Sequence, residues 1–339
     1  MQTACPKHME YGPCGGVGSD GTCEVGDFPC TFLDLPVRRW SGVDGTTLIQ
    51  HGARTDQALA TLALLDRGRV VVGDFPARAL DQDSLTACAR ALVGAVDIVL
   101  AGDATDARVQ FPPSLRTALM KAEGLRVWAG FNARDRNRVA LEAELHGLRA
   151  AGVDGVHCVT GDHTASGHRA DAMPVFDLDA TEMTALSRSL GHVTSVAAQP
   201  GRVPAPSRLP LVLEKERAGA DVCFVDHCGG AQPVARFVSQ ARAAGSRLRF
   251  IACVPVVLDR ASAALLASFP GISLPEGYVE GIKASDHPRR AGIDAAVELS
   301  ERMLEIDGVA GVDLSGGPGP GQEFAFAEAL AEISGRMSG

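Results

Sequence analysis

Apolar residues recur along the chain in short runs that are separated by longer amphipathic stretches. Eight of these runs predict buried strands, at residues 69–75, 96–101, 126–131, 155–159, 192–198, 221–226, 249–254 and 310–314. The stretches between them carry apolar residues at i, i+3 and i+4, as in 136–152 and 294–307, which predicts helices. Eight strand-helix alternations favour an α/β fold, a closed (β/α)8 TIM barrel rather than an open sheet. No GxGxxG or GxxxxGK[ST] motif follows a strand, so no phosphate-binding loop supports the open sheet.

Length, charge and apolar patterning narrow the class of protein. The chain has 339 residues, 46% of them hydrophobic, which predicts one large domain with a small appendage. The formal net charge of -9 argues against a nucleic-acid partner and favours a small-molecule partner. The first residues do not resemble a signal peptide, and no apolar run approaches the roughly 20 residues that span a bilayer. We therefore expect a cytoplasmic protein with no membrane partner, and we expect a homo-oligomer.

Four of the nine cysteines lie near the start of the chain, at Cys5, Cys14, Cys23 and Cys30. Glycines between them allow tight turns, so four thiolates could converge on one metal. A reducing compartment disfavours disulfides, and a zinc ion or an iron-sulfur cluster would supply folding energy to a segment with few apolar residues. The alternative is four reduced cysteines in a docked irregular segment. We predict a cysteine-rich module at 1–45, a linker helix at 46–68 and the barrel at 69–339.

Polar residues gather at the carboxyl ends of the predicted strands, where barrel enzymes place their catalytic groups. They are Asp74, Asp103, Asn132, Arg134, Thr160, Gly161, Asp162, His163, Gln199, Asp226, His227, Asp313 and Ser315. A polar ring of this kind suits a planar heterocycle whose nitrogens and carbonyls need directional hydrogen bonds. Cys228, next to Asp226 and His227, is either a small buried hydrophobic residue, a reactive thiol or a metal ligand.

Several segments resemble the methylenetetrahydrofolate reductase family. NARDRNRVALEAELHGLRAAGVDGVHCVTGDH (132–163) is similar to the family's third and fourth strands, VLEKERAGADVCFVDH (212–227) to the approach to its sixth, and FIACVPVVLDRASAALLASFPGISLPEG (250–277) to its seventh. GIDAAVELSERMLEIDGVAGVDL (292–314) resembles its last helix and strand, so the resemblance covers about 70–314. The opening CPKHMEYGPCGG resembles a cysteine-rich module that accompanies such reductases.

The resemblance implies a barrel that binds FAD and a tetrahydrofolate derivative and passes hydride to a one-carbon group on the folate. It implies that Asp162 bonds the pterin and tunes the flavin. It also implies a flavin seat formed by Arg134, Asp135, Arg136 and Asn137, with Asn132, Thr160, Gly161, His163 and Gln199 as further cofactor contacts. An arginine beside a strand end suits a diphosphate. Catalytic candidates are Asp162, Asp226, His227 and Asp74.

Three positions depart from the family pattern. Gly73 stands where the family carries the glutamate that protonates the bridging nitrogen of the folate, and we expect Asp74 to replace it only if a bulge re-aims its side chain. Val225, Asp226 and His227 stand where the family has Thr-Gln followed by an aromatic residue, and Thr160 replaces an arginine. In one interpretation Asp226 or His227 is the relocated acid and reduction survives. In the other, the protein is a flavin-free folate-dependent one-carbon or methyl-transfer enzyme, or a folate-binding subunit, with an electron-transfer or methyltransferase partner.

Overall fold

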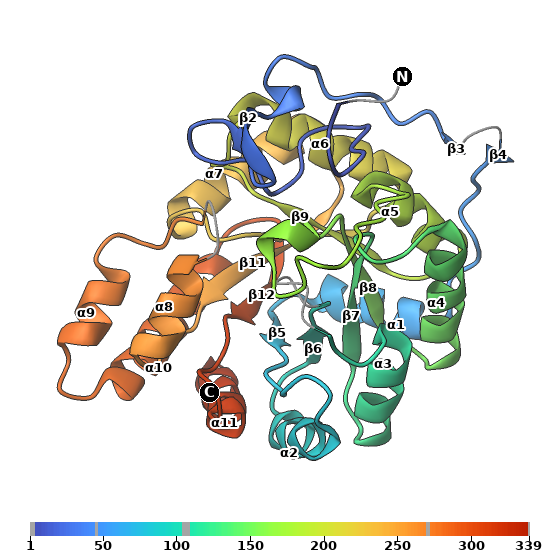
Figure 1. Ribbon diagram of the computed structural model, residues 1–339. Helices are drawn as coiled ribbons and strands as arrows, with labels where there is room; N and C mark the ends of the chain where they lie inside the picture. The colour runs from blue at the N-terminus through green and yellow to red at the C-terminus, as the bar shows by residue number, and fades with distance from the viewer. Residues whose placement is uncertain (1–3, 45–46, 104–108, 269–271, 338–339) are drawn as a thin grey trace.

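Eight parallel strands form a closed barrel in the computed structural model, which describes residues 4–44, 47–103, 109–268 and 272–337. Around the barrel the strands follow the order β10-β11-β12-β5-β6-β7-β8-β9 (Figure 1). Their bounds are β5 Val70–Asp74, β6 Ile98–Ala101, β7 Val127–Asn132, β8 Gly155–Val159, β9 Thr194–Ala198, β10 Val222–Val225, β11 Arg249–Pro255 and β12 Val309–Ser315. The predicted strands and their closure into a barrel are confirmed.

Helices connect these strands and cover the outside of the barrel (Figure 1). They are α1 Asp56–Arg67, α2 Gln82–Leu92, α3 Pro113–Ala122, α4 Arg138–Ala150, α5 Ala180–Ser189, α6 Ala205–Ala218, α7 Ala231–Ala243, α8 Arg260–Ser268, α9 Tyr278–Ala284, α10 Pro288–Leu304 and α11 Glu323–Met337. α1 packs Ala58, Leu64 and Leu65 against the apolar interior of the barrel. Among the described residues no helix has both the length and the apolar character needed to cross a membrane.

Side chains alternate along β5 between the interior of the barrel and its helical coat. Val70 and Val72 belong to the interior cluster that includes Trp128 and Phe224, so Asp74, two residues further, points the same way. A Cβ on Gly73 would instead lie 3.5 Å from Leu330 of α11, on the outer face. The pairing of β5 with β6 and β12 runs without a register shift. The condition that only a bulge could re-aim Asp74 is therefore wrong, because Asp74 already lies on the inward face of a regular strand.

The N-terminal segment lies beside α6 and over the end of β9, shown in blue in Figure 1. It contains β1 Thr22–Cys23, β2 Gly26–Pro29, the short helix η1 Thr31–Leu33, β3 Val43–Asp44 and β4 Thr47–Leu48. Tyr11 and Trp40 of this segment pack with Ala185 of α5 and Leu211 of α6. The carboxylate of Asp179, at the start of α5, accepts hydrogen bonds from the backbone of Glu10 and Tyr11. Apolar packing and buried hydrogen bonds thus hold the segment on one side of the barrel mouth.

Candidate functional site

Two carboxyl groups, the half-buried Asp74 and the buried Asp313, lie inside the upper part of the barrel. Asp313 is 2% exposed and pairs in register with Val72 and Cys253, so it faces the interior one layer below Asp74. Burial raises the pKa of Asp74 to about 6, and the charge of Asp226 adds to the effect. Burial and the charge of Asp74 raise the pKa of Asp313 well above its ordinary value. These groups can hold a proton near neutral pH.

Asp226 follows β10 and is held by two hydrogen bonds at the mouth of the barrel. Its Oδ2 accepts from Nε2 of Gln199 at 3.0 Å, and its Oδ1 accepts from the backbone N–H of His227 at 2.8 Å. His227 itself is 7% exposed, and burial lowers the pKa of its imidazole. A histidine that is neutral at physiological pH is a poor proton donor, so the environment favours Asp74 or Asp313 as the acid.

Several buried polar atoms in this region have no hydrogen-bond partner among the described residues. They include Oδ1 of Asp313, both ring nitrogens of His227, and Nδ2 of Asn132, the inward-facing last residue of β7. The other atom of the Asn132 amide, Oδ1, accepts from the backbone N–H of Arg134 at 3.0 Å, which fixes the orientation of the side chain. Unpaired buried donors and acceptors cost free energy, and they are often satisfied by a ligand.

In the segment predicted to bind the flavin, most polar side chains form hydrogen bonds with other groups of the protein. Arg134 donates twice to Asp135, at 2.8 Å each, and Arg136 donates to Asp103 at 2.7 Å. Asn137 is the N-cap of α4, because its Oδ1 accepts from the backbone N–H of Ala140 at 3.1 Å. The side chain of Asn137 thus makes a capping bond, and its predicted contact with a cofactor stays a prediction.

The loop after β8, with Thr160, Gly161, Asp162 and His163, lies under the N-terminal segment. Nζ of Lys7 donates to the carbonyl of Gly161 at 2.7 Å and forms an ion pair with Glu24. Glu24 in turn accepts from the backbone N–H of His163 at 2.8 Å. Burial raises the pKa of Asp162, and the charge of Lys7 opposes this rise.

Sequence reasoning missed the residues that join the segment to this loop. Lys7 and Gly161 are 154 positions apart, and no motif links them. Arg202 was missed as well, although it is 6% exposed and its Nε donates to the carbonyl of Val17 at 3.1 Å. Its Nη2 has no partner among the described residues.

The four N-terminal cysteines line one cavity of about 10 Å³ together with Phe28 and Phe32. The cysteines are Cys5, Cys14, Cys23 and Cys30, and none forms a disulfide. A space of this size holds about one water-sized particle. Among the described residues, however, no three or more His, Cys, Asp or Glu side chains are placed as they would be around a metal ion. The four cysteines therefore share one cavity, and their binding of a metal stays a prediction.

Comparison with known proteins places the features above in a family context. A closed barrel with a polar carboxyl-end site and a docked cysteine-rich segment defines a two-part (β/α)8-barrel protein. Residues 1–48 match the family model described as "Methylene-tetrahydrofolate reductase C terminal", and the eight-stranded parallel barrel fits a methylenetetrahydrofolate reductase-like barrel. No curated protein sequence matches the chain.

Solved structures with a similar backbone have low sequence identity to the chain. A 2,3-dimethylmalate lyase shares 13% identity with a TM-score of 0.44, over 84% of this chain and 96% of that one. A tryptophan synthase from M. tuberculosis shares 16% identity with a TM-score of 0.44, over 81% and 98%. An oxaloacetate acetylhydrolase shares 14% identity with a TM-score of 0.44, over 83% and 95%. These likenesses carry no argument about substrate or reaction.

Proposed function

We propose that the chain is a methylenetetrahydrofolate reductase-like enzyme of one-carbon metabolism, which binds a tetrahydrofolate derivative at the carboxyl ends of its strands. The observation that carries the proposal is the pair of inward-facing carboxyls on the neighbouring strands β5 and β12, the half-buried Asp74 and the buried Asp313. Burial raises the pKa of both, that of Asp74 to about 6. The match of residues 1–48 to the reductase-associated family supports it.

The proton needed for the reaction comes from this pair. When the methylene group of the folate takes up hydride from a reduced carrier, its bond to the bridging nitrogen breaks, and that nitrogen takes up a proton. Asp74 lies nearer the mouth and gives the proton, because a pKa of about 6 leaves a useful protonated fraction at neutral pH. The backbone N–H of Gly316, 3.0 Å from Oδ2 of Asp74, then stabilises the carboxylate. Asp313, whose pKa is also raised by burial, lies one layer below it.

Directional polar groups around the carboxyl pair suit the flat pterin ring. Gln199 and Asp226 are joined at 3.0 Å and present an amide and a carboxylate from neighbouring strands. Across the barrel, the unpartnered Nδ2 of Asn132 offers a donor. Asp162, in the loop that follows β8, adds an acid at the rim. A ring whose edge alternates donors and acceptors satisfies such groups together.

The fit to FAD is poorer than the fit to a pterin. A diphosphate is normally held by cations or backbone N–H groups. Here Arg134 pairs with Asp135, Arg136 pairs with Asp103, and Lys7 pairs with Glu24. We therefore derive no step through a flavin. This pairing favours the second candidate function, a flavin-free enzyme that transfers a one-carbon or methyl group to or from folate.

The N-terminal cysteines suit a zinc ion or an iron-sulfur cluster in the role of a structural support. Four thiols around one cavity are the donor set of a closed zinc site and of a cluster. A bound metal would tie β1 and β2 to η1 and so stiffen the segment that contacts the loop after β8. We assign it no part in the reaction.

Absorbance and folate turnover together test the proposal. The purified protein should bind methyltetrahydrofolate in calorimetry, and Asp74→Asn should lower its oxidation by an artificial acceptor by at least about 100-fold while binding is kept. Flavin absorbance in active protein would support the reductase, and folate binding without flavin would support the transfer enzyme. The exposed Asp66→Asn serves as a control with unchanged turnover. Protein that binds no folate would contradict both candidates.

A further inference from the structure

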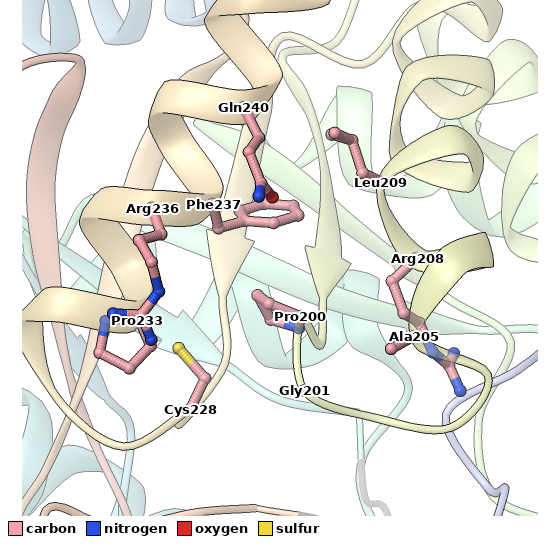
Figure 2. Close-up of a pocket in the computed structure, with 10 residues that line it drawn as sticks. All are labelled: Pro200, Gly201, Ala205, Arg208, Leu209, Cys228, Pro233, Arg236, Phe237 and Gln240. Carbon is pink, nitrogen blue, oxygen red and sulfur yellow. The ribbon is translucent and has the colours of Figure 1, made fainter.

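The loop between β9 and α6 places Arg202 beside the N-terminal segment at the barrel mouth. Figure 2 shows the preceding residues Pro200 and Gly201 on this loop, where they line a cavity of about 270 Å³ next to α6 and α7. The backbone N–H of Arg202 donates to the carbonyl of Gln199 at 3.1 Å, which closes a turn directly after the strand. Arg202 therefore follows by three residues the amide that is hydrogen-bonded to Asp226.

The guanidinium of Arg202 is buried but only partly paired. The residue is 6% exposed, and its Nε donates to the carbonyl of Val17 at 3.1 Å. The described residues provide no partner for the other two nitrogens and no ion pair, and Nη2 is buried without a hydrogen bond. A buried donor without a partner costs free energy, and a ligand that supplies an acceptor removes this cost.

The N-terminal segment reaches the rim of the folate site on both sides of Arg202. Gly15 packs against Gln199, since a Cβ on this glycine would lie 3.0 Å from Oε1 of the amide. Glu24 accepts from the backbone N–H of His163, in the loop after β8, at 2.8 Å. Val17 lies between these two contacts in the sequence and holds Arg202. The segment thus fixes this arginine where the loops after β8 and β9 meet.

Two carboxylates of the folate site face this arginine from different loops. Burial lowers the pKa of Arg202, and the charges of Asp226 and Asp162 oppose this fall. Neither carboxylate forms an ion pair with Arg202 among the described residues, so a ligand edge can lie between them and the guanidinium. Ionised carboxylates only accept hydrogen bonds, whereas a guanidinium only donates them. Such a set suits a ring edge that combines N–H donors with a carbonyl oxygen.

We propose that Arg202 is a specificity-determining residue, which donates to the C4 carbonyl oxygen of the pterin and discriminates against pteridines with a 4-amino group. This inference rests on the proposed function, because the ring belongs to the folate at the barrel mouth. The pyrimidine edge of a pterin carries N–H donors at N3 and at the 2-amino group, which the carboxylates accept. Its O4 needs a donor, and the nitrogens of Arg202 that Val17 leaves unpaired supply one.

A 4-amino group reverses the polarity of this contact. Its N–H groups point at the N–H groups of Arg202, so the guanidinium stays unpaired and two donors face each other. A site built to hydrogen-bond one group of a ligand rejects an analogue that lacks this group, because its own buried polar atoms are then left without a partner.

Calorimetry with tetrahydrofolate and tetrahydroaminopterin, which differ only in the group at C4, tests the inference. The unaltered protein should bind tetrahydrofolate at least about tenfold more tightly, since a charged buried hydrogen bond contributes that much. Arg202→Met should remove the preference by weakening tetrahydrofolate alone, and Arg202→Lys should keep part of it. Arg208→Lys is the matched control and should keep the preference. Arg208 also holds the segment, through the carbonyls of Pro13 and Cys14, but it donates to backbone carbonyls only.

The outcomes separate a direct contact from an effect on docking, and both from the proposed function. Trypsin cleavage at Arg38 and Arg39 reports whether the segment stays docked in each variant. Equal affinity of the unaltered protein for both ligands, or a preference that survives in Arg202→Met, would overturn the role of Arg202 and leave the folate enzyme standing. Loss of the preference in Arg208→Lys as well would assign it to docking and overturn the direct contact. Failure of the unaltered protein to bind either ligand would overturn the proposed function too.

Discussion

The charge of Asp74 raises the pKa of Asp313 across two neighbouring strands of one barrel. Two carboxyl groups so placed in a low-dielectric interior do not both ionise easily, so one of them retains a proton. Neither β5 nor β12 shows a register shift at these residues, and the pair follows from ordinary strand alternation. The arrangement makes an acid available near neutral pH without a metal or a histidine.

Stability should depend on pH through Asp74. Burial raises its pKa from 3.8 to about 6, so the folded state keeps a proton that the unfolded chain has lost between these pH values. This contribution is fully present below pH 3.8 and is lost as pH rises through about 6; it amounts to at most about 3 kcal/mol. Asp74→Asn should therefore be more stable, relative to the unaltered protein, at pH 8 than at pH 4. Urea unfolding at both pH values measures this.

Asp66 provides a control whose expected change of stability with pH has the opposite sign. Arg249 lowers the pKa of the exposed Asp66 by a hydrogen bond to its carboxylate. Asp66→Asn should therefore lose stability, relative to the unaltered protein, as pH rises from 3 to 8. If Asp74→Asn behaves as Asp66→Asn does, the burial of Asp74 has been misassigned.

The pH dependence of turnover should also reflect the ionisation of Asp74 and Asp313. Because the acid must be protonated to act, kcat/KM for folate reduction should fall as pH rises above about 6. Asp313→Asn removes the neighbouring carboxyl group, whose ionisation is opposed by the charge of Asp74. The variant should therefore lower the rate and also shift the pH at which kcat/KM has fallen by half. Rates measured from pH 5 to pH 9 give both midpoints. An unchanged midpoint in Asp313→Asn would mean that the two groups act independently.

Asp162 should matter for the ligand more than for the fold. Its carboxyl lies at the rim, where burial raises its pKa and the positive charge of Lys7 partly opposes this rise. Asp162→Asn should lower turnover or folate affinity by at least about tenfold, with a melting temperature within a few degrees of the unaltered protein. Thermal unfolding and calorimetry measure the two effects separately. Unchanged activity would remove Asp162 from the site.

The cysteine cavity should bind one metal equivalent. Anaerobically purified protein should contain one zinc ion or one cluster per chain, and Cys14→Ser should lose most of it. Cys228 lies outside the cavity, so the Cys228→Ser variant should retain the metal. Elemental analysis of the three proteins decides this point. Metal-free protein with intact activity would leave the cysteines as reduced residues of a docked segment.

Asp179 should control the attachment of the N-terminal segment. Its side chain is fully buried, and its Oδ2 accepts from the backbone N–H groups of both Glu10 and Tyr11, at 3.2 Å each. Asp179→Asn places an amide where these donors point and should destabilise the segment by about 2 kcal/mol. Trypsin should then cleave at Arg38 and Arg39 faster than in the unaltered protein. The exposed Asp177→Asn is the matched control, and equal cleavage rates in the two variants would contradict the assignment.

Local patterns predicted the fold well because each strand and helix carries its own signal. The apolar run before Asp74 and the amphipathic stretch before Gly155 needed no information from elsewhere in the chain. The strand-end rule also brought Asp226 and Gln199 to the same edge, where they are hydrogen-bonded.

Side-chain roles were harder to predict because one residue type serves several purposes. Asn137 lies in a segment that resembles a cofactor seat, yet it caps a helix. The bonds of Lys7 and Arg202 join distant parts of the chain, and a single sequence has no periodicity that reports them. The orientation of Asp74 depended on where its strand begins, which pattern reading locates only to within a few residues.

The docking of the N-terminal segment also constrains the order in which the protein can be assembled on the ribosome. The segment is synthesised before the groups that receive it, from Gly161 to Asp179 and Arg208, which are translated more than 100 residues later. Until they emerge, the four thiols and the aromatic residues Tyr11 and Trp40 lack the barrel surface on which the segment docks. Early capture of a metal by the nascent chain would protect these thiols during that interval.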